Sequence, residues 1–139
     1  MAEEPKLIPQ VTKELKPFFD AARNHQLMVQ KCDNCGALRF PAAPLCLNCD
    51  SDKASWTPVS GRGQVFSFTV MHRAYHPAFK APYILAVIEL DEGVKMTSNV
   101  VGIEHSRVKC GMPVEVAWDK LSDEVTLPRF RPAGQGAAR

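Results

Sequence analysis

The sequence has no long hydrophobic run, no basic leader and no strong charge imbalance, and each absence excludes a class of protein. The longest apolar run, YILAVI at 83–88, is much shorter than the roughly 20 residues of a membrane-spanning helix. The start of the chain, MAEEPKLIPQ, contains acids and prolines where a secretory signal has basic residues followed by an apolar segment. We therefore expect a cytoplasmic protein with no membrane partner.

The net charge of +2 is too small to indicate a nucleic acid or an anionic surface as the partner. The stretch SGRG at 60–63 lacks the preceding strand and following helix of a phosphate-binding loop. Of the 139 residues, 45% are apolar, which is enough for the core of one ordinary domain.

The cysteine pattern is the strongest local signal, because four of the five cysteines form two Cys-x-x-Cys pairs within KCDNCGALRFPAAPLCLNCDS, residues 31–51. In a reducing compartment, thiols at this spacing are more often metal ligands than disulfide partners. Two tight turns that each present two sulfurs complete a tetrahedron around one ion. The predicted ligands are Cys32, Cys35, Cys46 and Cys49. A closed site of this kind is typical of structural zinc, with iron and a pair of disulfides as the alternatives.

An amphipathic pattern precedes the cysteines, from Thr12 to about Met28. Apolar residues recur there at steps of three and four, which predicts a helix with one apolar face that is broken or started at Pro17. Large apolar side chains near the terminus of a small module have little of their own chain to cover them. We therefore weigh two roles for this face, docking on a partner protein and packing on the module's own core. The docking candidates are Leu15, Phe18 and Phe19.

From Trp56 onward, alternating apolar and polar residues predict five strands with turn residues between them. The predicted strands cover 61–73, 82–90, 94–103, 111–121 and 124–133. Five short strands are typical of a small closed barrel such as the OB-fold. Phe66 and Phe68 alternate onto one face of the first strand and are expected in the barrel core. Exposed together, they would instead fit a single-stranded nucleic-acid-binding module, which is an alternative function.

The expected fold is therefore mainly β with an N-terminal helix, a rubredoxin-like zinc ribbon and a five-stranded OB-fold barrel. We divide the chain into an arm and helix (1–30), the ribbon (31–55), the barrel (56–132) and a tail expected to be disordered (133–139). This order of parts, with GRGQVFSFTV, PYILAVIEL and PVEVAW…LPRFRP following the paired cysteines, resembles one bacterial and archaeal family. The chain is similar to the acyl-CoA-associated zinc-ribbon and OB-fold proteins called domain-of-unknown-function family thirty-five.

The resemblance implies an accessory subunit that is not itself catalytic. Members of that family associate with thiolase-fold enzymes, and some with hydratases or aldolases, that act on acyl-CoA thioesters. The implied partners are thus a thiolase-like catalytic subunit, in a hetero-oligomer that cleaves or forms a carbon–carbon bond, and the CoA part of the thioester as a shared ligand. A subunit of an acyl-CoA hydratase or aldolase is the alternative partner. The implied metal ligands are the four paired cysteines.

The longest irregular connection in the β region, HRAYHPAFKAP at 72–82, carries side chains that suit CoA. Arginine, lysine and histidine pair with phosphates, and aromatic rings stack on adenine. The alternative is a solvated loop whose aromatic side chains cap the end of the barrel. The candidates for CoA binding or for the partner interface are Arg62, His72, Arg73, Tyr75, His76, Lys80 and Tyr83.

The sequence places no nucleophile and base together in a way that predicts catalysis. The fifth cysteine, Cys110, and the four histidines are scattered along the chain, and Cys110 is expected to be a small buried hydrophobe. His72 and His76 have the spacing of a helical metal site, but Pro77 puts them in a loop. A free-standing iron-thiolate redox carrier is the last alternative, and it leaves the barrel without a role.

Overall fold

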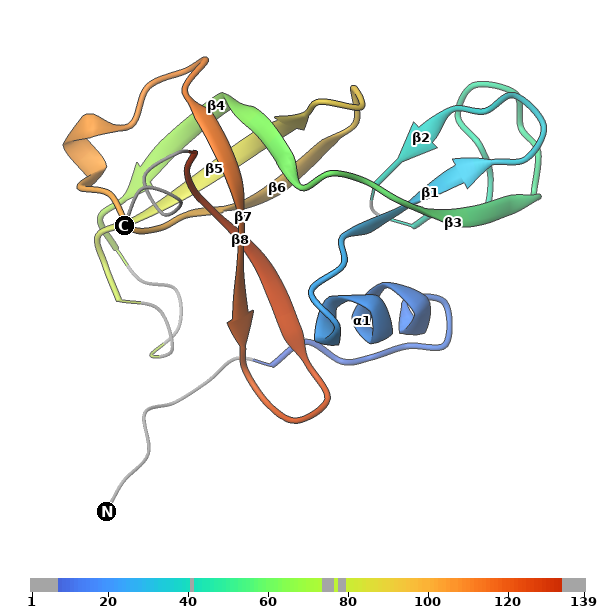
Figure 1. Cartoon of the computed structure of the whole chain (residues 1–139), viewed down its shortest axis with the longest axis horizontal. Helices are drawn as coiled ribbons and strands as arrows, with labels where there is room; N and C mark the ends of the chain where they lie inside the picture. The colour runs from blue at the N-terminus through green and yellow to red at the C-terminus, as the bar shows by residue number, and fades with distance from the viewer. Residues whose placement is uncertain (1–7, 41, 74–76, 78–79, 134–139) are drawn as a thin grey trace.

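The computed structural model describes residues 8–40, 42–73, 77 and 80–133, and it contains a three-stranded sheet, a closed five-stranded barrel and one α-helix (Figure 1). The elements in chain order are α1 (Lys16–Arg23), β1 (Met28–Cys32), β2 (Leu38–Arg39), β3 (Ala54–Pro58), β4 (Arg62–Met71), β5 (Tyr83–Leu90), β6 (Lys95–Val100), the 3-10 helix η1 (His105–Arg107), β7 (Pro113–Lys120) and β8 (Thr126–Pro132). This architecture confirms the predicted zinc ribbon followed by a small barrel. Within the described residues, no helix has the length and hydrophobicity to cross a membrane.

Helix α1 is shorter than the predicted span of 12–28. Pro17 lies in its first turn, where the missing N–H costs nothing because first-turn N–H groups have no partner within the helix. The helix ends at Arg23 with Asn24 as the C-cap, because His25 takes the left-handed conformation with φ of 59°. Met28, expected at the end of the helix, instead begins β1.

The ribbon is a sheet in the order β2-β1-β3, with β1 antiparallel to both neighbours. The pairing of β1 with β3 extends from Cys32 opposite Ala54 to Met28 opposite Pro58. The ribbon sheet therefore continues past residue 55, where the sequence suggested a boundary, and β3 leads almost directly into the barrel strand β4. Strand β1 likewise lies partly in the segment assigned to the arm and helix.

The barrel closes in the order β4-β5-β6-β8-β7. Its pairs are antiparallel except for the contact between β6 and β8, where Val100 lies opposite Phe130 in parallel. Phe130 and Ile88 are 0% exposed at its centre. Gly63 marks the tightest contact between β4 and β5, since a Cβ atom there would lie 2.3 Å from the carbonyl oxygen of Glu89.

A β-bulge in β4 overturns one expectation about the barrel core. The register of β4 against β5 shifts between Val65 and Ser67, so Phe66 is the extra residue. Phe66 is therefore turned outward and is 52% exposed, with the ammonium of Lys95 4.6 Å from the centre of its ring. Phe68 is partly buried against the core, so the two rings do not share one face.

The helix, the ribbon and the barrel share one hydrophobic core. Phe18 and Phe19 are each 5% exposed and belong to the same cluster of buried side chains as the barrel residues. The ring of Phe18 lies 5.3 Å from that of Phe40 and 6.4 Å from that of Trp56, and α1 also contacts β8 (Figure 1). This packing corresponds to the core role weighed for the apolar face. Within this chain, neither phenylalanine has the exposure that direct docking would need, and Leu15 is partly buried.

Candidate metal centre and ligand cavity

The four paired cysteines come together at one end of the ribbon. All four Sγ atoms lie within 4.8 Å of one another, with 3.5 Å between those of Cys32 and Cys49 and 3.7 Å between those of Cys35 and Cys46. A tetrahedral zinc ion with Zn–S bonds near 2.3 Å needs sulfurs about 3.8 Å apart. The residues present therefore fit one tetrahedral metal ion. A full set of four protein ligands would leave that ion no position for a substrate.

The two Cys-x-x-Cys turns repeat each other with an offset of 14 residues. In the first turn, the N–H of Gly36 donates to the carbonyl oxygen of Cys32, and in the second the N–H of Asp50 donates to that of Cys46, each at 2.9 Å. Gly36 and Asp50 both have positive φ, 80° and 64°, which the turn requires at this position. The backbone thus holds both pairs of sulfurs in the same way.

An asparagine in each turn reaches across to the other turn. The side-chain amide of Asn34 donates to Sγ of Cys49 at 3.3 Å, and that of Asn48 donates to Sγ of Cys35 at 3.4 Å. The Asn48 amide, followed by the N–H of Ala37, lowers the pKa of Cys35 to about 6. N–H groups that favour the thiolate in this way prepare the sulfur for a cation.

The pKa values of Cys32 and Cys49 shift in opposite directions. The backbone N–H of Cys35 is the largest cause that lowers the pKa of Cys32. The Asn34 amide also favours the thiolate of Cys49, but burial and the neighbouring thiols outweigh it and raise the pKa of Cys49. Four thiolates at this separation repel one another, so some of the four sulfurs keep a proton until a bound metal ion displaces it.

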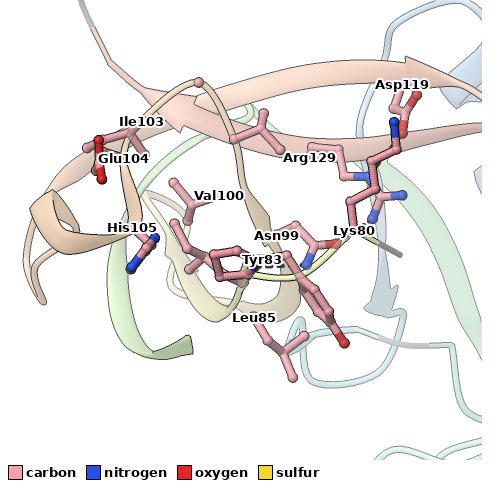
Figure 2. A pocket seen from close by; sticks show the side chains of 14 residues that line it. Lys80, Tyr83, Leu85, Asn99, Val100, Ile103, Glu104, His105, Asp119 and Arg129 are labelled. Carbon is pink, nitrogen blue, oxygen red and sulfur yellow. Dashed lines mark hydrogen bonds and ion pairs between the residues drawn. The ribbon is translucent and has the colours of Figure 1, made fainter. Parts of the chain in front are cut away.

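A cavity of about 800 Å³ opens on the barrel where β5, β6 and β8 lie side by side (Figure 2). Lys80, Asp119 and Arg129 gather at one end of it in that view, and Glu104 and His105 at the other, with Tyr83 and Asn99 between them. The apolar part of the lining consists of Pro82, Ile84, Leu85, Val100, Val101 and Ile103. A largely apolar cavity with a few charged groups is typical of a small-molecule site.

The Arg129 side chain is fixed in this cavity by two neighbours. Its Nε donates to Asp119 at 3.3 Å, and one terminal nitrogen donates to the side-chain oxygen of Asn99. Asn99 is itself anchored, because its amide donates to the carbonyl oxygen of Ile84 at 2.8 Å. A guanidinium has five N–H donors, so these two bonds orient it and leave donors for an anion.

A second, apolar cavity of about 310 Å³ lies between α1 and the barrel, next to the first one. The two share Leu85, Asn99 and Arg129 in their linings. Phe18, Phe40 and Leu127 are among the apolar residues that line the second cavity. The two cavities are therefore neighbours, one with charged residues in its lining and the other with mainly apolar walls beneath the helix.

The candidates from the 72–83 loop differ in where the structure places them. Lys80 and Tyr83 line the larger cavity, and the ring of His72 lies 5.8 Å from the ring of His105, which also lines it. Arg73 is exposed and does not line the cavity. Tyr75 and His76 lie outside the described residues. The metal pairing of His72 with His76, which the sequence disfavoured because of Pro77, is therefore not tested.

Arg62 does not join the loop residues. It begins β4, whereas His72 directly follows the end of that strand, and nine residue steps of strand correspond to roughly 30 Å. Cys110 is exposed rather than buried, which corrects the expectation of a small buried hydrophobe. It does not line either cavity.

Sequence reasoning missed Asn99, His105, Asp119 and Arg129 as cavity residues. Asn99 and Arg129 stand on different strands, 30 positions apart, and only the β6–β8 contact brings them together. The sequence did contain one signal. Asn99 in SNV and Arg129 in PRF are polar residues beside apolar ones within predicted strands. That signal becomes specific only when the order of the strands is known.

Two family models match the chain, in the order in which the structure places the two sheets. The model described as "ChsH2, rubredoxin-like zinc ribbon domain" matches residues 19–54, and that described as "ChsH2, C-terminal OB-fold domain" matches residues 56–119. A solved structure titled "Ltp2-ChsH2(DUF35) aldolase" superposes with a TM-score of 0.81 and 40% identity, covering 90% of this chain and 98% of that one.

Curated relatives include subunits of acyl-CoA enzymes. The "Probable enoyl-CoA hydratase alpha subunit" of Thermomonospora curvata is 39% identical over 134 residues, 94% of this chain and 42% of the relative. The "Benzoylsuccinyl-CoA thiolase subunit BbsA" of Geobacter metallireducens is 31% identical over 86 residues, 62% of this chain and 57% of the relative. The chain spans 42% and 37% of the lengths of the two hydratase alpha subunits that it matches.

A shorter relative is matched over most of its length. The "DUF35 domain-containing scaffold protein" of Methanocaldococcus jannaschii is 33% identical over 96 residues, 68% of each chain. Its name agrees with that of the superposed structure, and the four-thiol ribbon and five-stranded barrel agree with both family models. The chain belongs to the DUF35 family of zinc-ribbon and OB-fold proteins.

Proposed function

We propose that this protein is a non-catalytic accessory subunit of a cytoplasmic hetero-oligomer. It docks on a catalytic subunit that acts on an acyl-CoA thioester, and its larger cavity binds part of the CoA. The observation that carries the proposal is the cavity itself, in which Lys80, Arg129 and Tyr83 surround an apolar floor. The names of the hydratase, aldolase and thiolase relatives support the same class of partner.

The chemistry of the cavity suits the two ends of CoA. Arg129 and Lys80 offer N–H donors to phosphate oxygens, and the rings of Tyr83 and His105 offer surfaces for adenine. The carboxylates of Asp119 and Glu104 balance the two positive charges, so an anion is held here by directed hydrogen bonds and not by a net positive charge. The apolar cavity beneath α1 is then the place for the pantetheine arm or the acyl chain.

The partner class that we propose first is a hydratase or an aldolase. The hydratase and aldolase relatives are 39% and 40% identical over at least nine tenths of this chain, against 31% over 62% for the thiolase subunit. A thiolase that cleaves or forms a carbon–carbon bond is the second candidate. In each case the partner supplies the nucleophile and the bases, and the closed metal centre has a structural role.

The first test is co-purification of the tagged full-length chain from its native host, with the recovered proteins identified by mass spectrometry. We expect a catalytic subunit of an acyl-CoA hydratase, aldolase or thiolase in a fixed ratio. Recovery of nucleic acid alone, or of no enzyme subunit, would overturn the accessory role.

The second test is calorimetric titration of CoA into the recovered complex, with two matched variants. Arg129→Ala removes a cavity guanidinium, whereas Arg131→Ala removes one on the same strand that pairs with Glu115 at 2.9 Å and does not line the cavity. Loss of a charged hydrogen bond predicts CoA affinity about 10-fold weaker for Arg129→Ala and little change for Arg131→Ala. Equal affinity in all three complexes would refute the CoA site.

A further inference from the structure

The second Cys-x-x-Cys turn exposes leucines at the positions where the first turn has charges. With the offset of 14 residues, Lys31 and Asp33 correspond to Leu45 and Leu47. Leu47 is 99% exposed and Leu45 is 52% exposed, although Cys46 between them is buried in the metal centre. Two apolar side chains on a fold that tolerates charges at the matching positions indicate a contact surface.

The turn holds these leucines rigidly. The N–H of Asn48 donates to Sγ of Cys46 at 3.4 Å, and the N–H of Asp50 donates to the carbonyl oxygen of Cys46 at 2.9 Å. A bound metal ion would fix the same turn through two sulfurs. A side chain on a preorganised turn loses little conformational freedom when a partner covers it. The entropy cost of binding is therefore smaller than for a side chain on a flexible segment.

A cavity of about 640 Å³ lies beside the turn and extends this surface. Ala42, Ala43 and Pro44 line it and lead directly into Leu45. A standard interface buries roughly 800 Å² on each partner, and two leucine side chains supply far less than that. A docking surface here must therefore include the whole segment Ala42–Leu47.

The charges of this cavity select its occupant. Its lining includes the carboxylates of Glu14 and Asp52 and the guanidinium of Arg39. Two nitrogens of the guanidinium are engaged within the chain, since Nε donates to the side-chain oxygen of Gln30 and Nη2 to the carbonyl oxygen of Ala43, both at 2.8 Å. Nη1 is buried without a partner among the described residues and can donate to a backbone carbonyl of the occupant. The carboxylates therefore favour a cationic side chain with an apolar stem, which is a lysine or an arginine.

We propose that Ala42–Leu47, with Glu14 and Asp52, is the surface on which the catalytic subunit docks. The subunit covers the two leucines with apolar side chains and inserts a lysine or arginine into the adjacent cavity. This inference rests on the proposed accessory function and names the part of the chain that makes the contact. It gives the ribbon a role separate from the ligand cavity of the barrel.

The test measures how tightly the full-length chain binds the purified catalytic subunit recovered by co-purification, using biolayer interferometry. Leu47→Asp should raise the Kd at least about 10-fold, as truncation of a central interface side chain does. Asp52→Lys should also raise it, and the loss should be smaller at high salt. Phe66→Ser is the matched control, because Phe66 is 52% exposed on the barrel, and its Kd should match that of the wild type.

Metal content is measured for every variant, and Leu47→Ser replaces Leu47→Asp if the aspartate variant loses its metal. An unchanged Kd for both Leu47 and Asp52 variants would refute the surface while leaving the accessory function intact. Recovery of no catalytic subunit by the wild type would refute the function and this inference together. Self-association that Leu47→Asp abolishes would show that a second copy of the chain is the occupant, which also overturns the proposal.

Discussion

Truncation of Phe18 tests most directly whether the apolar face of α1 is a core element. Phe18 is 5% exposed and its ring contacts those of Phe19, Phe40 and Trp56 at centroid distances of 5.2, 5.3 and 6.4 Å. Removing a buried phenylalanine side chain costs about 3–5 kcal/mol, from lost burial and the cavity left behind. We take about 3 kcal/mol for Phe18→Ala, because the adjacent apolar cavity already reduces the packing on one side.

This free energy translates into a measurable shift in Tm. An unfolding entropy of about 2.1 cal/mol/K per residue gives roughly 0.3 kcal/mol/K for this chain, so 3 kcal/mol lowers the Tm by about 10 °C. Thermal unfolding followed by circular dichroism measures the shift, with Leu47→Ala as the exposed control that should change the Tm by less than about 2 °C. A shift below about 3 °C for Phe18→Ala would refute the core role and restore docking as the function of this face.

Three further predictions concern the metal centre and the barrel. Asn48→Ala removes the amide that donates to Cys35, so metal affinity measured by chelator competition should fall about 10-fold, with Asn24→Ala as a control at a distant exposed asparagine. Because the pKa of Cys35 is lowered to about 6, its thiolate is present above that pH and is lost as the pH falls through it. Cobalt binding followed by its thiolate absorbance should therefore weaken steeply below about pH 6, and an unchanged affinity at pH 5 would contradict this. Gly63→Ala places a Cβ against backbone atoms of β5 and should cost about 2 kcal/mol in urea unfolding, whereas Ser67→Ala, at an exposed position of the same strand, should change it by less than about 0.5 kcal/mol.

The metal centre could be predicted from the sequence because its information is local. Each pair of ligands is separated by two residues, and a tight turn is the simplest conformation that directs both sulfurs to one ion. The asparagine bonds between the turns are different, because they depend on how Asn34 and Asn48 cross between two segments. Spacing alone gives no information about that crossing.

In α1 and in β4, the spacing of apolar residues in the sequence gives a wrong prediction of the structure. Leu27 and Val29 continue the helical spacing of α1 although Leu27 precedes β1 and Val29 belongs to it, because a buried strand also places apolar residues at short intervals. The bulge at Phe66 changes which side chains face inward after it. No residue type marks the bulge in the sequence, so simple alternation placed Phe66 in the core.

The ligand cavity could be predicted only in part, for topological reasons. Lys80 lies shortly before β5 and Tyr83 begins that strand, so the sequence grouped them correctly at the cavity. Arg129 comes from the last strand, and its proximity to Asn99 depends on the parallel contact between β6 and β8. Arg62 was a candidate because it lies between Gly61 and Gly63 at the start of the first barrel strand, and the structure places it at the opposite end of β4 from the loop.

The contact between α1 and β8 has a consequence for synthesis of the chain on the ribosome. The helix is translated early, but the strand against which it packs ends at Pro132, roughly 100 residues later. At about 5–20 residues per second, Phe18 and Phe19 wait some 5–20 s before their barrel surface exists. During that interval the nascent chain displays two phenylalanines that the finished protein buries, which makes this segment the natural first substrate for chaperones.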